Sequence, residues 1–177
     1  MGEIKSTMDI IMEKTKGLTM TEEEKKAFKR QEMEGKVKGL VQKFIDGVLD
    51  KERLRIEVTA LQEKDKAMID AIIREESLAR IELGEDNEPL LEILGSILDM
   101  NTKPIREMLD GYEGKLSQER EARERLLMKQ LEKQGISGSA VVPNLEGDSE
   151  WKQDLLAMKR AFKEEVVKSV ASMENTT

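Results

Sequence analysis

Apolar residues recur three and four positions apart along two stretches of equal length, residues 37–83 and 88–134. This spacing places the apolar side chains along one stripe of an α-helix and leaves the other faces polar. A glycine and an asparagine lie between the two stretches and a proline follows as the second residue of the second stretch, and these residue types end one helix and begin another. The sequence therefore predicts an all-α fold built on a long antiparallel, coiled-coil-like helical hairpin with its turn at residues 84–87.

Signals at both ends extend this hairpin to residues 21–134. Thr21 and Glu24 have the spacing of a capping box, in which each side chain bonds the backbone N–H of the other residue. Gly135 is a suitable C-terminal cap for the second arm. The paired stretches 37–83 and 88–134 would each be about 70 Å long, because an α-helix rises about 1.5 Å per residue.

Two places should disturb the hairpin. Pro104 lacks an N–H and disfavours a helical conformation in the residue before it, so the second arm should bend near residue 100. Asn101 either occupies a core position that specifies register or caps a helix that restarts there, as Thr102 could. Gly35 and Gly39 indicate either a close helix crossing or a loosened, flexible start of the first arm.

Helical spacing also marks both ends of the chain. Residues 1–20 predict a short N-terminal amphipathic helix. Residues 149–172 predict a C-terminal amphipathic helix with a capping side chain at Asp148 or Ser149. Between the hairpin and this last helix, residues 135–148 are rich in Gly, Ser and Pro and predict a linker with a short extended piece. The linker is long enough for the last helix to fold back on the hairpin or to reach a second subunit.

Three apolar surfaces lack a predicted partner within the chain. Two are the faces of the terminal helices, and the third lies in the first arm. There the hairpin pairing puts the charged stretch 117–125 opposite residues 46–54, which leaves apolar side chains uncovered. We take all three surfaces as candidate partner-binding sites. Their residues are Ile4, Met8, Ile11 and Met12 in the first helix, Val48 and Leu49 in the first arm, and Trp151, Leu155, Met158 and Phe162 in the last helix.

Missing residue types exclude much familiar chemistry. The chain has no histidine and no cysteine, so it cannot build the common zinc, haem or iron–sulfur sites, a cysteine nucleophile or a histidine-dependent triad. It also has no glycine-rich phosphate loop. Glu85, Asp86 and Glu88 cluster at the predicted turn, but acids at a helix start are more typical of solvated groups that complement the helix dipole than of a metal site. We therefore expect no enzyme activity, no cofactor and no metal.

Charge is unevenly distributed along the chain. The net charge of the whole chain is −7, and the segment 84–99 carries acids but no Lys or Arg. A basic stripe that would bind nucleic acid is missing, and no apolar run approaches the roughly 18 residues that would span a bilayer. These features predict a cytoplasmic protein that binds neither nucleic acid nor membrane.

The opening segment MGEIKSTMDIIMEKTKGLTMTEEEKK, residues 1–26, resembles the start of a family of small uncharacterised bacterial helical proteins of unknown function. The resemblance implies a bacterial, cytosolic origin. It implies no activity, ligand or site residue, because none is known for that family.

Exposed helical faces without catalytic chemistry are typical of proteins that act by contact. We expect a non-enzymatic cytosolic scaffold, adaptor or assembly subunit that binds a protein partner, associates with itself as a homo-oligomer, or does both. The alternative is a chaperone-like or regulatory binding protein that uses its methionine-bearing terminal helices, because methionine adapts to differently shaped partners.

Overall fold

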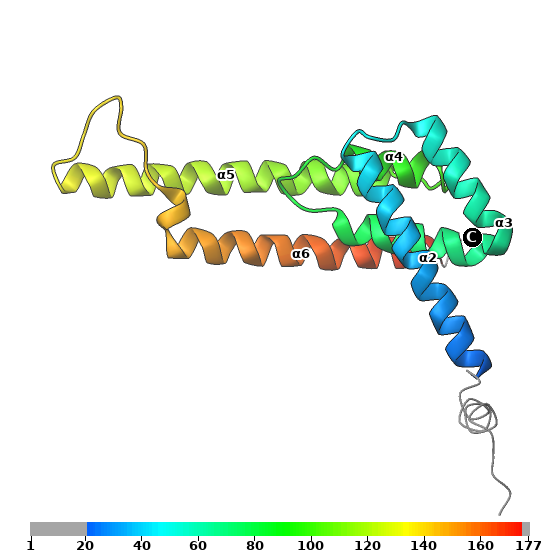
Figure 1. Ribbon diagram of the computed structural model, residues 1–177. Helices are drawn as coiled ribbons and strands as arrows, with labels where there is room; N and C mark the ends of the chain where they lie inside the picture. The colour runs from blue at the N-terminus through cyan, green and yellow to red at the C-terminus, as the bar shows by residue number, and fades with distance from the viewer. Residues whose placement is uncertain (1–20, 175–177) are drawn as a thin grey trace, which may run out of the picture.

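The computed structural model describes residues 21–174, with side chains through residue 170, and the regular secondary structure of these residues is entirely helical. This confirms the predicted fold class. The predicted N-terminal helix over residues 1–20, with Ile4, Met8, Ile11 and Met12, lies outside the described residues. The elements are α2 (Glu22–Ile45), α3 (Lys51–Arg80), α4 (Glu88–Ser96), α5 (Lys103–Lys133), the short 3-10 helix η1 (Leu145–Gly147) and α6 (Ser149–Glu174) (Figure 1).

Helix α2 begins at the predicted capping box. The Thr21 hydroxyl accepts from the Glu24 N–H at 3.2 Å, and the Glu24 carboxylate accepts from the Thr21 N–H at 2.7 Å. Further along, Met33, Val37 and Val41 are buried against the rest of the core. Their spacing of four residues explains why one stripe of α2 is covered while its opposite face meets solvent.

The prediction of one continuous helix over residues 37–83 is wrong, because the chain turns at residues 46–50. Gly47 has a φ of +68°, a conformation that favours glycine. Its N–H donates to the carbonyl of Phe44 at 3.0 Å, which closes the end of α2. Asp50 then caps α3 by accepting from the Arg53 N–H at 2.8 Å. The apolar spacing of three and four residues continues through this turn, so it concealed the break. The local capping residues end one helix here and start the next.

Helix α3 contains a second interruption at Asp65, whose φ of −170° and ψ of 87° are not helical. The Asp65 carboxylate accepts from the Met68 N–H at 3.2 Å, so it caps the helical segment that follows. Lys29 of α2 lies 3.9 Å from the same carboxylate. Beyond the kink, α3 crosses α2 (Figure 1), and Arg30 of α2 pairs with Glu75 at 2.7 Å. Asp65 therefore acts as a helix cap inside the stretch that was predicted to be one continuous helix.

Residues 81–87 connect α3 to α4, and Asn87 organises this connection. Its side chain is buried, accepts from the Glu82 N–H at 2.9 Å, and donates to the carbonyls of Glu82 and Glu85 at 2.8 and 3.0 Å. Asn87 occupies the N-cap position of α4, but its side chain makes no capping bond to that helix. Pro89 lies in the first turn of α4, as predicted.

Between α4 and α5 the chain reverses at residues 97–102. Arg106, in the first turn of α5, bonds the Glu88 carboxylate at 2.8 Å, although a single straight helix would hold these residues about 27 Å apart. The Asn101 carboxamide accepts from the Lys103 N–H at 3.1 Å where α5 begins, with Pro104 in its first turn. The predicted bend near residue 100 is thus a full reversal with a helix restart. The second predicted arm, like the first, is divided.

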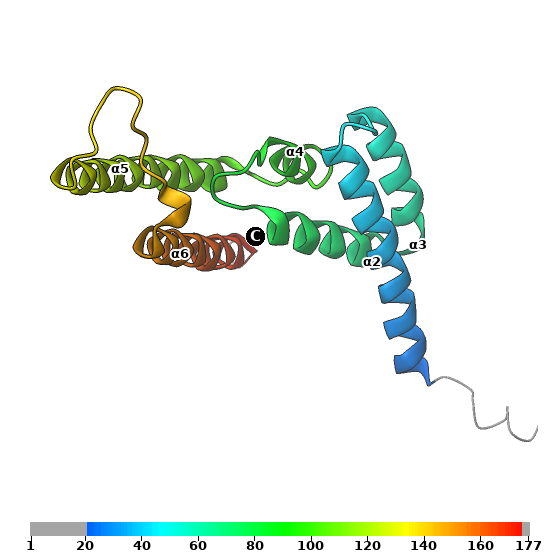
Figure 2. The ribbon, with the colours of Figure 1, turned by 60° about the vertical axis from the view of Figure 1, so that its left-hand side comes forward.

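Helices α5 and α6 pack against each other and form an arm that extends away from the bundle of α2, α3 and α4 (Figures 1 and 2). Gly135, with a φ of +80°, ends α5 as predicted, and the following N–H of Ile136 donates to the Leu131 carbonyl at 3.0 Å. Asp148 caps α6 by accepting from the Trp151 N–H at 2.7 Å. The last helix therefore folds back on its own chain.

Candidate functional site

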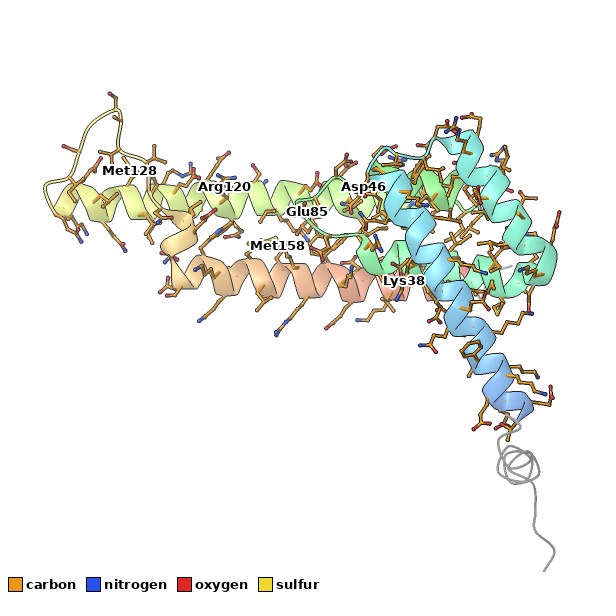
Figure 3. The ribbon with its side chains drawn as sticks, in the orientation of Figure 1. Lys38, Asp46, Glu85, Arg120, Met128 and Met158 are labelled. Carbon is orange, nitrogen blue, oxygen red and sulfur yellow. The ribbon has the colours of Figure 1, made fainter. Side chains whose placement is uncertain are left out.

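The apolar face of α6 is covered by α5. Trp151 is 9% exposed and Phe162 is 1% exposed, and Met158 packs against the core from the side of α6 that faces α5 (Figure 3). The rings of Tyr112 and Phe162 meet edge to face with centroids 5.4 Å apart. Leu155 is half-buried on the same face. The predicted partner-binding residues of the last helix therefore pack against other parts of the same chain.

The other described candidates lie in the turn between α2 and α3. Val48 is 68% exposed, whereas Leu49 is half-buried against the core. Neither is near the face of α6 that contains Trp151, so the predicted site residues form no single surface among the described residues.

A different apolar surface lies at the far end of the arm. The side chain of Arg123 bonds both Asp148 and Glu150 at the start of α6, so the part of α5 beyond Arg123 extends past α6. The linker crosses this free end and forms a groove of about 570 Å³ with it. Figure 3 shows Met128 there, beside the linker. We call this the tip groove, and its walls are Glu121, Glu124, Arg125, Met128, Lys129 and Glu132 of α5 and Val141, Val142 and Pro143 of the linker.

Apolar side chains are unusually exposed at this end of the arm. Val142 is 83% exposed, the highest value among the large exposed apolar side chains of the described residues. Ile136 and Leu126 nearby are 47% and 45% exposed. Of these three, Val142 lines the tip groove, whereas Ile136 and Leu126 do not. An exposed apolar side chain on a concave surface is more typical of an interaction site than one that stands alone. Sequence reasoning missed this site. The one available signal was the run of two valines and a proline in a linker otherwise rich in Gly and Ser.

The charged rim of the tip groove carries both signs. Arg125 and Lys129 lie on the same groove wall as Glu121 and Glu132. Glu124 is already paired with Arg120 at 3.1 Å. A partner would therefore meet an apolar centre bordered by charges that orient it, the usual anatomy of a protein–protein contact.

The acidic turn shows no sign of a cation site. Arg106 bonds the Glu88 carboxylate and lowers the pKa of that group, while Asp86 accepts from the Glu88 N–H at 3.0 Å. Among the described residues, no three acids are grouped so that they could hold a metal ion. The side chains of Asp86 and Glu88 therefore take part in local structure.

Comparison of the chain with protein-family models, with curated proteins and with solved structures finds no match. In the part of the chain that the structure describes, no helix combines the length and apolar character needed to cross a membrane.

Proposed function

We propose that this protein is a non-enzymatic cytoplasmic adaptor that binds a protein partner through the tip groove. The observation that carries the proposal is Val142, which is 83% exposed at the edge of a groove of about 570 Å³. Burying an exposed apolar side chain of this size contributes about 1.5–3 kcal/mol to association before the costs of binding. The fold gains nothing evident from leaving Val142 in water.

The arm suits this role mechanically. One wall of the groove is the regular helix α5, and Arg123 ties the far end of the linker to that helix. A preformed wall loses little conformational entropy when a partner binds. Met128 supplies an adaptable side chain within the groove. A contact confined to this small area is expected to be transient, because stable interfaces bury more surface.

The alternative, a chaperone-like binder that uses methionine-bearing helices, has less support in the described residues. Met158 of α6 is packed against the core and is not presented for clients. Met8 and Met12 lie outside the described residues.

A matched pair of substitutions tests the adaptor. The chain is purified from the cells that produce it, the recovered partner is identified, and its affinity is measured with purified components. Val142→Ser should weaken binding at least about fivefold, whereas Val48→Ser should leave it unchanged, since Val48 is equally apolar and 68% exposed but lies in the bundle.

If Val48→Ser weakened binding and Val142→Ser did not, the partner would bind at the turn between α2 and α3. Equal affinity for both variants and the parent chain would rule out the tip groove. Sedimentation of the parent chain and both variants tests whether the partner is a second copy of the chain. In that case Val142→Ser shifts the assembly toward monomer and Val48→Ser does not.

A further inference from the structure

A second concavity lies at the base of the arm, where α5, α6 and the 81–87 connection meet. Its volume is about 320 Å³, near the lower end of the range for small-molecule sites. Its apolar wall comes from three separate parts of the chain. The residues of this wall are Leu83, Leu116, Leu145, Trp151 and Leu155.

Side-chain bonds to the backbone hold two walls of this pocket in place. On one side, the buried Asn87 fixes the connection through its bonds to Glu82 and Glu85, and Lys163 of α6 donates to the Ile81 carbonyl at 2.6 Å. On the other side, Asn144 accepts from the Gly147 N–H at 3.1 Å and closes η1. The pocket is therefore largely preformed, and a ligand would not have to order its walls.

Four charged side chains complete the pocket, two of each sign: Glu85, Glu146, Arg120 and Lys159. Figure 3 shows Glu85 where the connection approaches α5, and Arg120 further along α5. Neither Glu85 nor Glu146 forms an ion pair with any described residue. Arg120 bonds Glu124 only through Nε, and Lys159 lies 3.9 Å from Glu82. These groups thus retain capacity for a ligand of mixed charge.

We infer that this pocket binds a small zwitterion with an apolar group, of the size of an apolar amino acid. Arg120 and Lys159 provide donors for a carboxylate, and Glu85 and Glu146 provide acceptors for an ammonium group. The apolar wall around Trp151 takes the side chain. The balanced charges disfavour a ligand that carries only one sign, because a lone anion would face two carboxylates. The two carboxylates likewise disfavour the phosphate groups of a nucleotide. This site is separate from the tip groove and does not depend on the proposed adaptor function.

Trp151 provides a direct readout, because it is the only tryptophan in the chain. Its emission is recorded while the full-length protein is titrated with L-leucine, with 4-methylpentanoate, which lacks the ammonium group, and with 3-methylbutylamine, which lacks the carboxylate. Leucine should give a saturable change with half-saturation at or below about 1 mM, and each analogue should bind at least about tenfold more weakly.

Variants on the surface of the pocket separate specific binding from a general effect. Arg120→Gln and Glu146→Gln should each weaken leucine binding at least about fivefold. Their matched controls are Arg53→Gln on α3 and Glu113→Gln on α5, exposed residues outside both this pocket and the tip groove, and these should bind leucine like the parent chain.

Two results would overturn the inference. One is the absence of saturable binding of leucine up to about 10 mM, both in Trp151 emission and in calorimetry, since calorimetry also detects binding that leaves the emission unchanged. The other is equal affinity for leucine and both analogues, which would mean that the pocket takes apolar groups without reading charge.

Discussion

Arg123 of α5 and Asp148 at the start of α6 are joined by a bond of 2.7 Å between Nη2 and Oδ2, and their side chains are only 17% and 11% exposed. The other oxygen of the same carboxylate accepts from the Trp151 N–H at 2.7 Å. One side chain therefore caps α6 and fastens the end of the linker to α5. This bond fixes the point beyond which α5 extends freely and forms the tip groove.

Acid should lower the stability of the protein by protonating Asp148. Arg123, and after it the Trp151 N–H, lower the pKa of Asp148 below its usual range. A carboxyl group with a lowered folded-state pKa stabilises the fold above its unfolded pKa of about 3.9, and this contribution is lost as pH falls through the folded value. Asp148→Asn keeps the capping oxygen but removes the charge, so its melting temperature should lie below that of the parent chain near pH 7. The two melting temperatures should approach each other as pH falls from about 4 through the folded-state pKa of Asp148. A difference that does not change with pH would contradict this account.

Two glycines should respond to alanine in opposite directions. A Cβ at Gly39, inside α2, would meet no atom within 4 Å, so Gly39→Ala should stabilise the protein by about 0.5–1 kcal/mol. Gly47 has a φ of +68°, so Gly47→Ala should cost about 1 kcal/mol or more. Urea unfolding measures both changes. Loss of stability in Gly39→Ala would instead indicate the close helix crossing that the sequence left open.

Asn87 should be the most sensitive polar residue of the α3–α4 connection. It is 6% exposed and makes three bonds to the backbone. Asn87→Ala leaves those backbone groups without their partner, at a cost of about 2–3 kcal/mol in unfolding free energy. Asn101→Ala is the matched control, because Asn101 is exposed and makes one such bond, and its cost should stay below about 1 kcal/mol. Equal losses would show that Asn87 does not hold the connection.

The ionisation of Tyr112 at alkaline pH tests the contact between α5 and α6. Its hydroxyl donates to the Glu165 carboxylate at 2.7 Å, and this bond, followed by burial, raises the pKa of Tyr112 above its ordinary value near 10. The resulting stabilisation is present below the unfolded pKa and is lost as pH rises through the folded value. Since Tyr112 is the only tyrosine, ultraviolet absorbance follows its ionisation directly. Glu165→Gln should move the titration back toward pH 10, and an unchanged curve would mean that the bond is not formed in solution.

Local signals in the sequence were reliable guides to helix ends. The capping box at Thr21, the glycine at 135 and the capping carboxylate at Asp148 all act as their chemistry predicts. Each depends only on residues within a few positions of one another. The break at Gly47 carried the same kind of signal, a glycine followed by the capping Asp50, but the heptad pattern running through it concealed the turn.

Which helix packs against which could not be predicted from such local signals. Equal stretches of apolar spacing fit one long hairpin as well as they fit two separate pairs, because periodicity identifies the buried face of a helix but not what covers it. The structure pairs α2 with α3 and α5 with α6, so the face around Trp151 is filled from within. The tip groove follows from that pairing, since only the α5–α6 register leaves the end of α5 free. It could not be derived without the arrangement in space.

The central claim, that the arm carries a partner-binding surface at its tip, is tested most directly by site-specific photocrosslinking in the native cells. A photoreactive amino acid is placed at Val142 in one variant and at Val48 in another, two exposed valines at opposite parts of the molecule. The account predicts one discrete crosslinked species from position 142 that Met128→Gln in the groove diminishes, and none from position 48. A discrete species from position 48 with none from position 142 would contradict it.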